Sequence, residues 1–317
     1  MTVKSCDDVE DINPNEEPQR LGPIPSATTQ ASSSTNARST PEIEKEYVHR
    51  VYDAIAPHFN STRFAKWPKV ASFLNSLPSG SLILDAGCGN GKYMGLNPSC
   101  YFIGSDISPS LVQICARREH EVLTADAVNL PYRTAFGDAA ISIAVLHHLS
   151  TEIRRKKAIE ELVRIVKTGG LVLITVWARE QEDESLIKKW TPLTYKYAEE
   201  WVGPSCHSKV SRSVSLESIL ETDDTSGKHE NENEESEYFV PWHLPYHRAE
   251  IGGASAAAVA NGFAKKDDKK CAVVFNRYYH VFGKGELQRL ASSVGSAVVI
   301  DHFFDKSNWC VILKKTS

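Results

Sequence analysis

Five short apolar runs alternate with helical segments between residues 66 and 180, and this alternation constrains the fold more than any other feature of the chain. The runs are SLILDAG, YFIGSDIS, EVLTADA, AISIAVLHH and GLVLITVWA. Each is rich in Val, Ile and Leu without a clean two-residue alternation, which is typical of strands buried on both faces of a parallel sheet. The sequence therefore predicts an α/β fold with a doubly wound, mostly parallel sheet.

The segments on either side of these runs extend the predicted fold. A helix is expected to begin at residues 40–42 (TPE), where a hydroxyl can cap it and a proline occupies the first turn, and to end near Pro57. A second helix is expected over residues 150–168, opened by Ser150. Near the C-terminus, AVVIDHFFD and NWCVILK flank Lys306-Ser307 and predict an antiparallel hairpin at the sheet edge.

Three polar segments interrupt this pattern. Residues 1–40 are rich in Ser, Thr, Pro, Asn and acids, so we expect a disordered tail before a single domain at 41–317. Low-complexity loops are expected at about 205–237 and 252–270. The formal net charge of −4 is uneven, because residues 1–40 carry −3 and residues 221–237 carry −7, which leaves +6 elsewhere. Such a mildly basic body is compatible with a polyanionic partner.

Several classes of protein are disfavoured by what the chain lacks. No apolar run approaches the roughly 18 residues that span a bilayer, and the acidic, polar N-terminus differs from a signal or transit peptide. We therefore expect no membrane association and a cytoplasmic location, with the nucleus as a second one. The seven cysteines form no CxxC pair, so we expect reduced thiols, and neither a disulfide framework nor a metal site.

A glycine-rich turn, LDAGCGNGKY at residues 84–93, follows the first apolar run and precedes a helical segment. Glycine lets the backbone approach a ligand closely. The loop residues expected to contact a cofactor are Gly87, Cys88, Gly89 and Gly91. Alone, this spacing is a weak signal, because dinucleotide-binding folds use a related loop. NAD would require GxGxxG, whereas Lys92 occupies the sixth position here.

Three carboxylates make the glycine loop more specific. Asp85, Asp106 and Asp126 end the first three predicted strands, so all three point into the crevice where such sheets bind ligands. Asp106 is placed to accept bonds from a ribose diol, Asp126 from an adenine amino group, and Asp85 can hold an ammonium directly or through water. Ile107 would lie against the adenine, with Ala127 as a further contact. The expected cofactor is S-adenosylmethionine; the alternative is an ordinary Rossmann-type turn with surface acids.

The glycine loop, with AVLHHL and TGGLVLITVW behind it, resembles the class I methyltransferases over residues 65–180. A second set of segments is more specific: EKEYVHRVYDAIAPHFNSTRFAKWP, GCGNGKY, GSDIS, ISIAVLHHLST, VWAREQ, FVPWHLP, RYYHVFGKGEL and NWCVIL. In this order they resemble the eukaryotic tRNA methyltransferases that esterify carboxymethyluridine at the wobble position. The resemblance covers nearly all of the ordered chain and implies a Rossmann-like sheet and a tRNA anticodon loop as substrate. The tail and the two polar loops depart from the pattern.

His147 and His148 close the fourth apolar run. In the reaction that the resemblance implies, the methyl group goes to a carboxylate, whose reference pKa of about 4 leaves it ionised at pH 7, so no general base is required. The two histidines are therefore interpreted as neutral donors that orient the carboxylate, or as pocket walls. Strand geometry predicts that only one of them reaches the substrate. Simple packing beside the cofactor is the open alternative, and a metal site is not expected.

Further residues are expected to face the substrate. The N-terminal helix and NSTRFAKWP are expected to form a lid, in which Tyr52 reaches the cofactor, Arg63 binds a carboxylate of the cofactor or substrate, and Trp67 walls the pocket. Four late residues combine aromatic faces with positive charge, as a flipped base and its phosphates require: Trp242, His243, Arg277 and Tyr279. A solvated surface position for Arg63 and core packing for the tyrosine stay open.

The resemblance also implies a partner, a small zinc-binding activator protein that adds a strand to the free edge of the sheet, here near residues 121–126. The zinc belongs to that partner. Two other functions stay open. A small-molecule, quinone-type methyltransferase would account for the paired histidines but not for FVPWHLP, RYYHVF or the basic body. A non-catalytic scaffold would have no use for Asp85, Asp106 and the three loop glycines.

Overall fold

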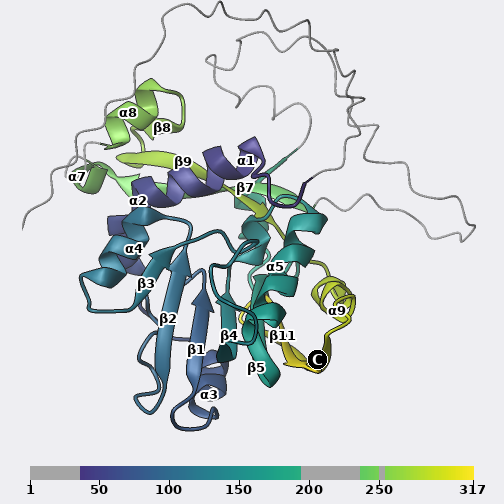
Figure 1. Ribbon diagram of the computed structural model, residues 1–317. Helices are drawn as coiled ribbons and strands as arrows, with labels where there is room; N and C mark the ends of the chain where they lie inside the picture. Colours follow the sequence, from purple (N-terminus) through teal and green to yellow (C-terminus); the bar gives the residue numbers. More distant parts are fainter. Residues whose placement is uncertain (1–35, 194–235, 250–253) are drawn as a thin grey trace, which may run out of the picture. The chain divides into compact units, whose positions relative to one another are not determined.

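The computed structural model describes residues 36–193, 236–249 and 254–317 (Figure 1). Within these residues the main sheet has seven strands in the order β10-β11-β5-β4-β1-β2-β3. The five strands from β5 to β3 in this order pair in parallel, and β11 is antiparallel to both β5 and β10. The predicted parallel sheet with an antiparallel edge hairpin is confirmed. The strands are β1 (Leu82–Ala86), β2 (Tyr101–Asp106), β3 (Val122–Thr124), β4 (Gly137–Ile143), β5 (Val166–Trp177), β10 (Ala297–Asp305) and β11 (Asn308–Lys315).

The central strands of this sheet are buried on both faces. Ile83 and Leu84 are neighbours in β1 and both are fully buried, yet they belong to different cores. Leu84 packs with α5 (Glu152–Ile165) and α9 (Glu286–Ser292), whereas Ile83 packs with α3 (Pro68–Asn75). Two-sided burial is the physical reason why the apolar runs show no alternation of apolar and polar residues.

A second, antiparallel sheet was not expected from the sequence. Its four strands lie in the order β6-β7-β9-β8 and comprise β6 (Thr191–Pro192), β7 (Glu237–Pro245), β8 (Ala264–Asp267) and β9 (Ala272–His280). The segments FVPWHLP and RYYHVF, far apart in sequence, pair here, with Val240 opposite Arg277. The aromatic residues of these segments therefore meet in one layer.

The N-terminal helical segment packs against this second sheet. It consists of α1 (Glu42–Glu44), the π-helical turn η1 (Lys45–His49) and α2 (Arg50–Thr62). Val48 packs with Phe239 and Tyr278, while Ile55 packs with Trp242. Figure 1 shows α2 between β9 and the upper ends of β2 and β3, beside α4 (Pro109–Ala116). The segment thus covers the crevice at the carboxyl ends of the parallel strands.

Two helix boundaries differ from those expected. α2 continues through Pro57 to Thr62, and the turn beyond the proline is held by Phe59, whose ring lies 5.9 Å from that of Trp242. Tertiary packing thus overrides the helix-breaking tendency of proline. α5 begins at Glu152, capped by Thr151 instead of Ser150.

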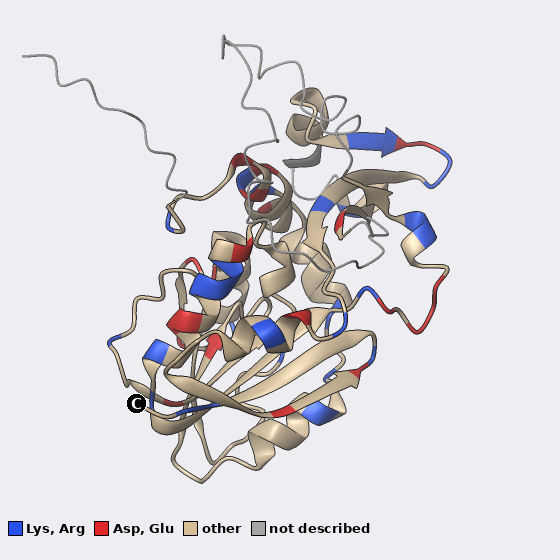
Figure 2. Cartoon of the chain, turned by 90° about the vertical axis from the view of Figure 1, so that its right-hand side faces the viewer, with Lys and Arg blue, Asp and Glu red and all other residues tan. Residues whose placement is uncertain are grey.

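The segments expected to be polar have mixed outcomes. Residues 1–35, 194–235 and 250–253 lie outside the described residues, and with them most of the predicted tail and of the 205–237 loop. Within 252–270, where a loop was expected, residues 254–260 form α8 and residues 264–267 form β8. Figure 2 shows the lysines of β8 and of the turn after it as two blue stretches separated by red. Among the described residues, no helix is long and apolar enough to cross a membrane.

Candidate active site

A pocket of about 440 Å³ opens at the carboxyl ends of β1, β2 and β4, beneath the N-terminal helices and β9. Parallel α/β sheets bind ligands at this end of their strands. Fifteen of the residues expected at a site line it: Tyr52, Arg63, Trp67, Asp85, Gly87, Cys88, Gly89, Asp106, Ile107, Asp126, Ala127, His147, His148, Arg277 and Tyr279. The structure therefore brings all but one of the predicted cofactor residues and most of the predicted substrate residues into one cavity.

Three expected site residues do not line the pocket. Gly91 has a φ of +74°, and a side chain there would meet Cys115 and His120, so its role is conformational. Trp242 is 6% exposed and lies in the core beside α2. His243 follows it in β7 and is only partly buried, with its Nε2 3.0 Å from Nζ of Lys270. Because successive strand residues face opposite sides, these two neighbours cannot share one pocket.

The glycine loop is shaped by its backbone. Gly87 has a φ of +87°, and a Cβ added there would lie 2.2 Å from a methyl carbon of Val145. Its amide and that of Cys88 both donate to the carbonyl of Ser105 in β2. The loop is thereby tied to the second strand, with its glycine surface turned toward the pocket.

Two buried carboxylates form the acidic side of the pocket. Asp106 accepts bonds from the amides of Gly89 (2.8 Å) and Ser108 (2.9 Å). Asp85 is 2% exposed, and its Oδ2 has no hydrogen-bond partner among the described residues. Burial raises the pKa of Asp85 to about 7, Asp106 adds to the rise, and Lys92 opposes it. A buried acceptor without a donor fits the ammonium of an amino-acid moiety, as expected for S-adenosylmethionine.

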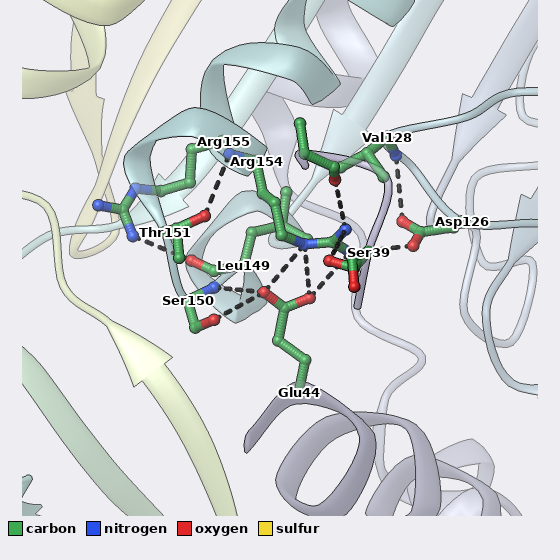
Figure 3. A network of polar contacts seen from close by, with 10 residues as sticks. Ser39, Glu44, Asp126, Val128, Leu149, Ser150, Thr151, Arg154 and Arg155 are labelled. Atoms are coloured by element: carbon green, nitrogen blue, oxygen red, sulfur yellow. Dashed lines mark hydrogen bonds and ion pairs between the residues drawn. The ribbon is translucent and has the colours of Figure 1, made fainter. Parts of the chain in front are cut away.

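Asp126 takes part in a buried ionic network that the sequence did not predict (Figure 3). Nη2 of Arg154 lies 2.9 Å from an oxygen of Asp126, and Nε lies 3.0 and 3.1 Å from the two oxygens of Glu44. Glu44 also accepts bonds from the amide and hydroxyl of Ser150. Arg154 further donates to the carbonyl of Ser39. One buried arginine therefore connects the N-terminal segment to a carboxylate of the cofactor pocket.

The two histidines lie in a short 3₁₀ helix, η2 (Leu146–His148), and not in a strand. β4 ends at Ile143, and Ala144 adopts a φ of +61°. Alternation along a strand therefore does not apply, and both histidines line the pocket. The strand alternation from which only one was expected to reach the substrate is therefore wrong, whereas the number of histidines that contact the substrate stays a prediction.

Their hydrogen bonds assign different tautomers to the two rings. The amide of Trp177 donates to Nδ1 of His147 at 3.2 Å, so the ring proton is on Nε2, which has no partner among the described residues. Nδ1 of His148 donates to the carbonyl of Tyr278 at 2.9 Å, and its Nε2 accepts from the hydroxyl of Tyr52 at 2.8 Å. Burial lowers the pKa of both histidines well below the usual value, and the nearby cations add to the effect. Both rings are therefore neutral at pH 7.

Arg277 brings positive charge to the pocket from β9, whereas Asp85 and Asp106 lie at the ends of β1 and β2. It is 4% exposed, forms no ion pair with a described residue, and its Nε is buried without a partner. Nη1 donates to the hydroxyl of Tyr279 at 2.8 Å. Its guanidinium lies 4.9 Å from the ring of Trp242, and that of Arg63 lies 5.0 Å from the same ring. Trp242 therefore forms cation–π contacts with Arg63 and Arg277 and does not stack on a ligand.

Several pocket residues were missed from the sequence. Lys92 lines the pocket between Asp85 and Arg63, and burial lowers its pKa to about 8. Its position in the glycine loop predicts a place in the pocket, but in the sequence analysis Lys92 served only as an argument against NAD. Glu44 and Trp177 also line the cavity. No local signal marks these two, because their partners lie far away in sequence.

Comparison with known proteins identifies close relatives. Residues 84–174 match the family described as a methyltransferase domain. The chain is 60% identical to a protein of Arabidopsis thaliana named tRNA (carboxymethyluridine(34)-5-O)-methyltransferase, over 90% of this chain and 84% of that one. A Saccharomyces cerevisiae protein of the same name is 37% identical, with coverage of 86% and 97%. A Xenopus tropicalis relative is 40% identical over 86% of this chain, which spans only 41% of that longer protein.

Proposed function

The chain belongs to the family of tRNA (carboxymethyluridine(34)-5-O)-methyltransferases, and we propose that its pocket esterifies the carboxylate of 5-carboxymethyluridine at position 34 of tRNA. The methyl donor is S-adenosylmethionine, which supplies an electrophilic methyl group on a sulfonium. One observation carries the proposal: Arg277, a buried guanidinium that forms no ion pair with a described residue, lines the same cavity as the buried carboxylates Asp85 and Asp106. A cationic cofactor and an anionic substrate thus have separate places.

The substrate arrives as a ready nucleophile. A carboxylic acid has a reference pKa of about 4 and is ionised at pH 7, so no side chain must remove a proton. The pocket must instead orient one carboxylate oxygen toward the methyl group and exclude water. The two neutral histidines that line the pocket meet this requirement without acting as bases.

The residues divide this task between them. Arg277 holds the carboxylate, and because its guanidinium already donates to Tyr279 and lies over aromatic rings, its charge is not concentrated on the nucleophile. The Nε2 proton of His147 is available as a neutral orienting donor. His148 has both nitrogens occupied by Tyr52 and Tyr278, so it holds the lid helix and β9 together. A quinone-type substrate without a carboxylate would not need a buried cation in this position.

A protein partner completes the proposal. The expected activator would add a strand beside β3, which is the edge of the main sheet and has three residues. The outer side of β3 pairs with no other described strand, and an edge of this kind is open to strand addition. We further propose that the enzyme acts in the cytoplasm or the nucleus, where its tRNA substrate is found.

The test follows the fate of the transferred methyl group. The protein, with and without a small activator, is incubated with methyl-labelled S-adenosylmethionine and tRNA bearing 5-carboxymethyluridine, and tRNA with unmodified uridine 34 serves as the matched control. Mild alkali is then added. Label released as volatile methanol from the modified tRNA alone is the expected result, because only an ester is cleaved in this way. Label that stays on the RNA would mean methylation of nitrogen or carbon, and absence of label with the activator present would overturn the proposal.

A further inference from the structure

The segment Arg63–Trp67 connects α2 to α3 and borders the pocket; we call it the rim segment. It has no helical or strand structure, and its side chains alternate. Residues 63–66 are all exposed, but Arg63, Ala65 and Trp67 line the pocket, whereas Phe64 and Lys66 do not. The rim segment therefore has an inner face toward the substrate and an outer face toward solvent.

Phe64 has the largest exposed fraction of any large hydrophobic side chain in the described residues, at 74%. It contributes little to the core, and exposed apolar surface beside a binding site is typical of a contact area for a partner. Its neighbours define the kind of partner. No Asp or Glu occurs between Ala54 and Leu84, a stretch that contains Arg63, Lys66 and Lys69.

Further positive charge lies next to the rim segment. Nζ of Lys92 is 4.9 Å from the ring of Trp67 and 3.5 Å from the carbonyl of Ala65. Nζ of Lys69 lies 4.5 Å from the ring of Phe303. An exposed phenyl ring in a stretch of chain that carries cations and no Asp or Glu suits single-stranded nucleic acid, whose bases stack on aromatic rings and whose phosphates pair with lysine.

The geometry of wobble-base methylation indicates which nucleotide would bind there. Nucleotide 34 must leave the stack of the anticodon loop to enter the pocket, so a neighbouring base loses a stacking partner at the pocket mouth. On the basis of the proposed function, we propose that Phe64 stacks on a base adjacent to nucleotide 34 and that Lys66 pairs with a phosphate of the same strand. The outer face of the rim segment is then a docking surface for the anticodon loop.

Substitution of Phe64 tests this contact. Phe64→Ala is expected to lower kcat/KM for tRNA about tenfold, in keeping with the contribution of one base–aromatic stack. Phe64→Trp restores the activity, because stacking needs only an aromatic face. Affinity for S-adenosylmethionine, measured by calorimetry, stays unchanged. The matched control is Tyr101→Ala, which removes another highly exposed ring, 70% exposed, at the start of β2 and thus at the opposite end of the strands from the pocket.

A thermodynamic cycle identifies the base. Wild type and Phe64→Ala are compared on tRNAs that carry 5-carboxymethyluridine and lack the base at position 33 or at position 35. At the position that Phe64 contacts, removal of the base should lower kcat/KM of the wild type about tenfold. The same removal should not lower kcat/KM of Phe64→Ala any further.

Three results would overturn the inference. One is full activity of Phe64→Ala on tRNA. The second is that removal of the base at position 33 or at position 35 lowers kcat/KM of Phe64→Ala as much as it lowers kcat/KM of the wild type. The third is a loss that occurs only with the activator present, which would make Phe64 a protein contact. In each case methyl-ester formation by the wild type shows that the proposed function itself holds, whereas a wild type that forms no ester refutes both.

Discussion

The two sides of the pocket differ in how they are built. On the cofactor side, Asp85, the loop glycines and Asp106 come from about twenty consecutive residues around β1 and β2, and much of the contact surface is backbone. On the substrate side, Arg63, His147 and Arg277 come from three distant parts of the chain and meet only because β9 packs over η2. The first side is acidic, and the second is basic and aromatic.

This difference follows from the two ligands. A sulfonium with an ammonium group is attracted by carboxylates, whereas a nucleotide with an added carboxylate needs cations and ring faces. Separation of opposite charges within one cavity also fixes which ligand binds on which side, since each ligand is disfavoured in the other's place. Four predictions test this division, beginning with the largest effect.

Asp106→Ala is expected to reduce affinity for S-adenosylmethionine roughly a thousandfold. Two ribose hydroxyls on one carboxylate contribute about 1.5–3 kcal/mol each, and the amide of Gly89 loses its acceptor as well. Calorimetry measures the dissociation constant, and circular dichroism checks the fold. Asp301→Ala, at an exposed position of β10, is the control. A loss of tRNA affinity with unchanged cofactor affinity would contradict this assignment, because it would place Asp106 on the substrate side of the pocket.

Arg277→Met is expected to lower kcat/KM for tRNA about a hundredfold and to leave cofactor affinity unchanged. Loss of one partner of a buried charge pair costs about 2–5 kcal/mol in a complex. The free energy of unfolding should stay the same or increase, because Arg277 is buried without an ion pair to any described residue and methionine fills similar space. Thermal unfolding distinguishes a substrate-binding role from a structural role, because a variant that lacks a purely structural arginine would be less stable than the wild type. Arg117→Gln, at an exposed position, serves as the control.

The pH dependence should differ between the two sides. Burial and Asp106 raise the pKa of Asp85 to about 7, so the carboxylate takes up a proton as the pH falls through 7 and loses the charge that the ammonium needs. The dissociation constant of S-adenosylmethionine should therefore rise about tenfold per pH unit below about pH 7. Asp85→Asn should bind weakly with no such slope.

The substrate side should show no titration over the same range. Burial lowers the pKa of His147 and His148, so both stay neutral as the pH falls from about 8 to about 6. With cofactor and tRNA both saturating, kcat should remain constant in this interval. A decline in kcat below about pH 7 under these conditions would mean that a histidine acts as a base.

The parts that were predicted correctly from the sequence are local. The parallel strands, the C-terminal hairpin and the glycine loop follow from patterns within a few residues, since burial on two faces and tight turns impose direct demands on neighbouring side chains. The placement of Trp242 was not predicted correctly, because its environment depends on α2, nearly two hundred residues earlier. The second sheet was missed for the same reason: its strands β6 and β7 are separated by more than forty residues.

By itself, the sequence determined the fold class, the cofactor loop with its carboxylates, and, through family resemblance, the reaction. Tertiary structure alone decided which histidine keeps an available donor, since this depends on the amide of Trp177 and the carbonyl of Tyr278. It also decided that Arg277 is buried with no ion pair to the part of the chain that the structure describes, and that Arg154 links Glu44 to Asp126 across 110 and 28 positions of sequence. Hydrogen-bond donors, acceptors and charges acquire their partners only when distant segments pack together, and no local pattern encodes that pairing.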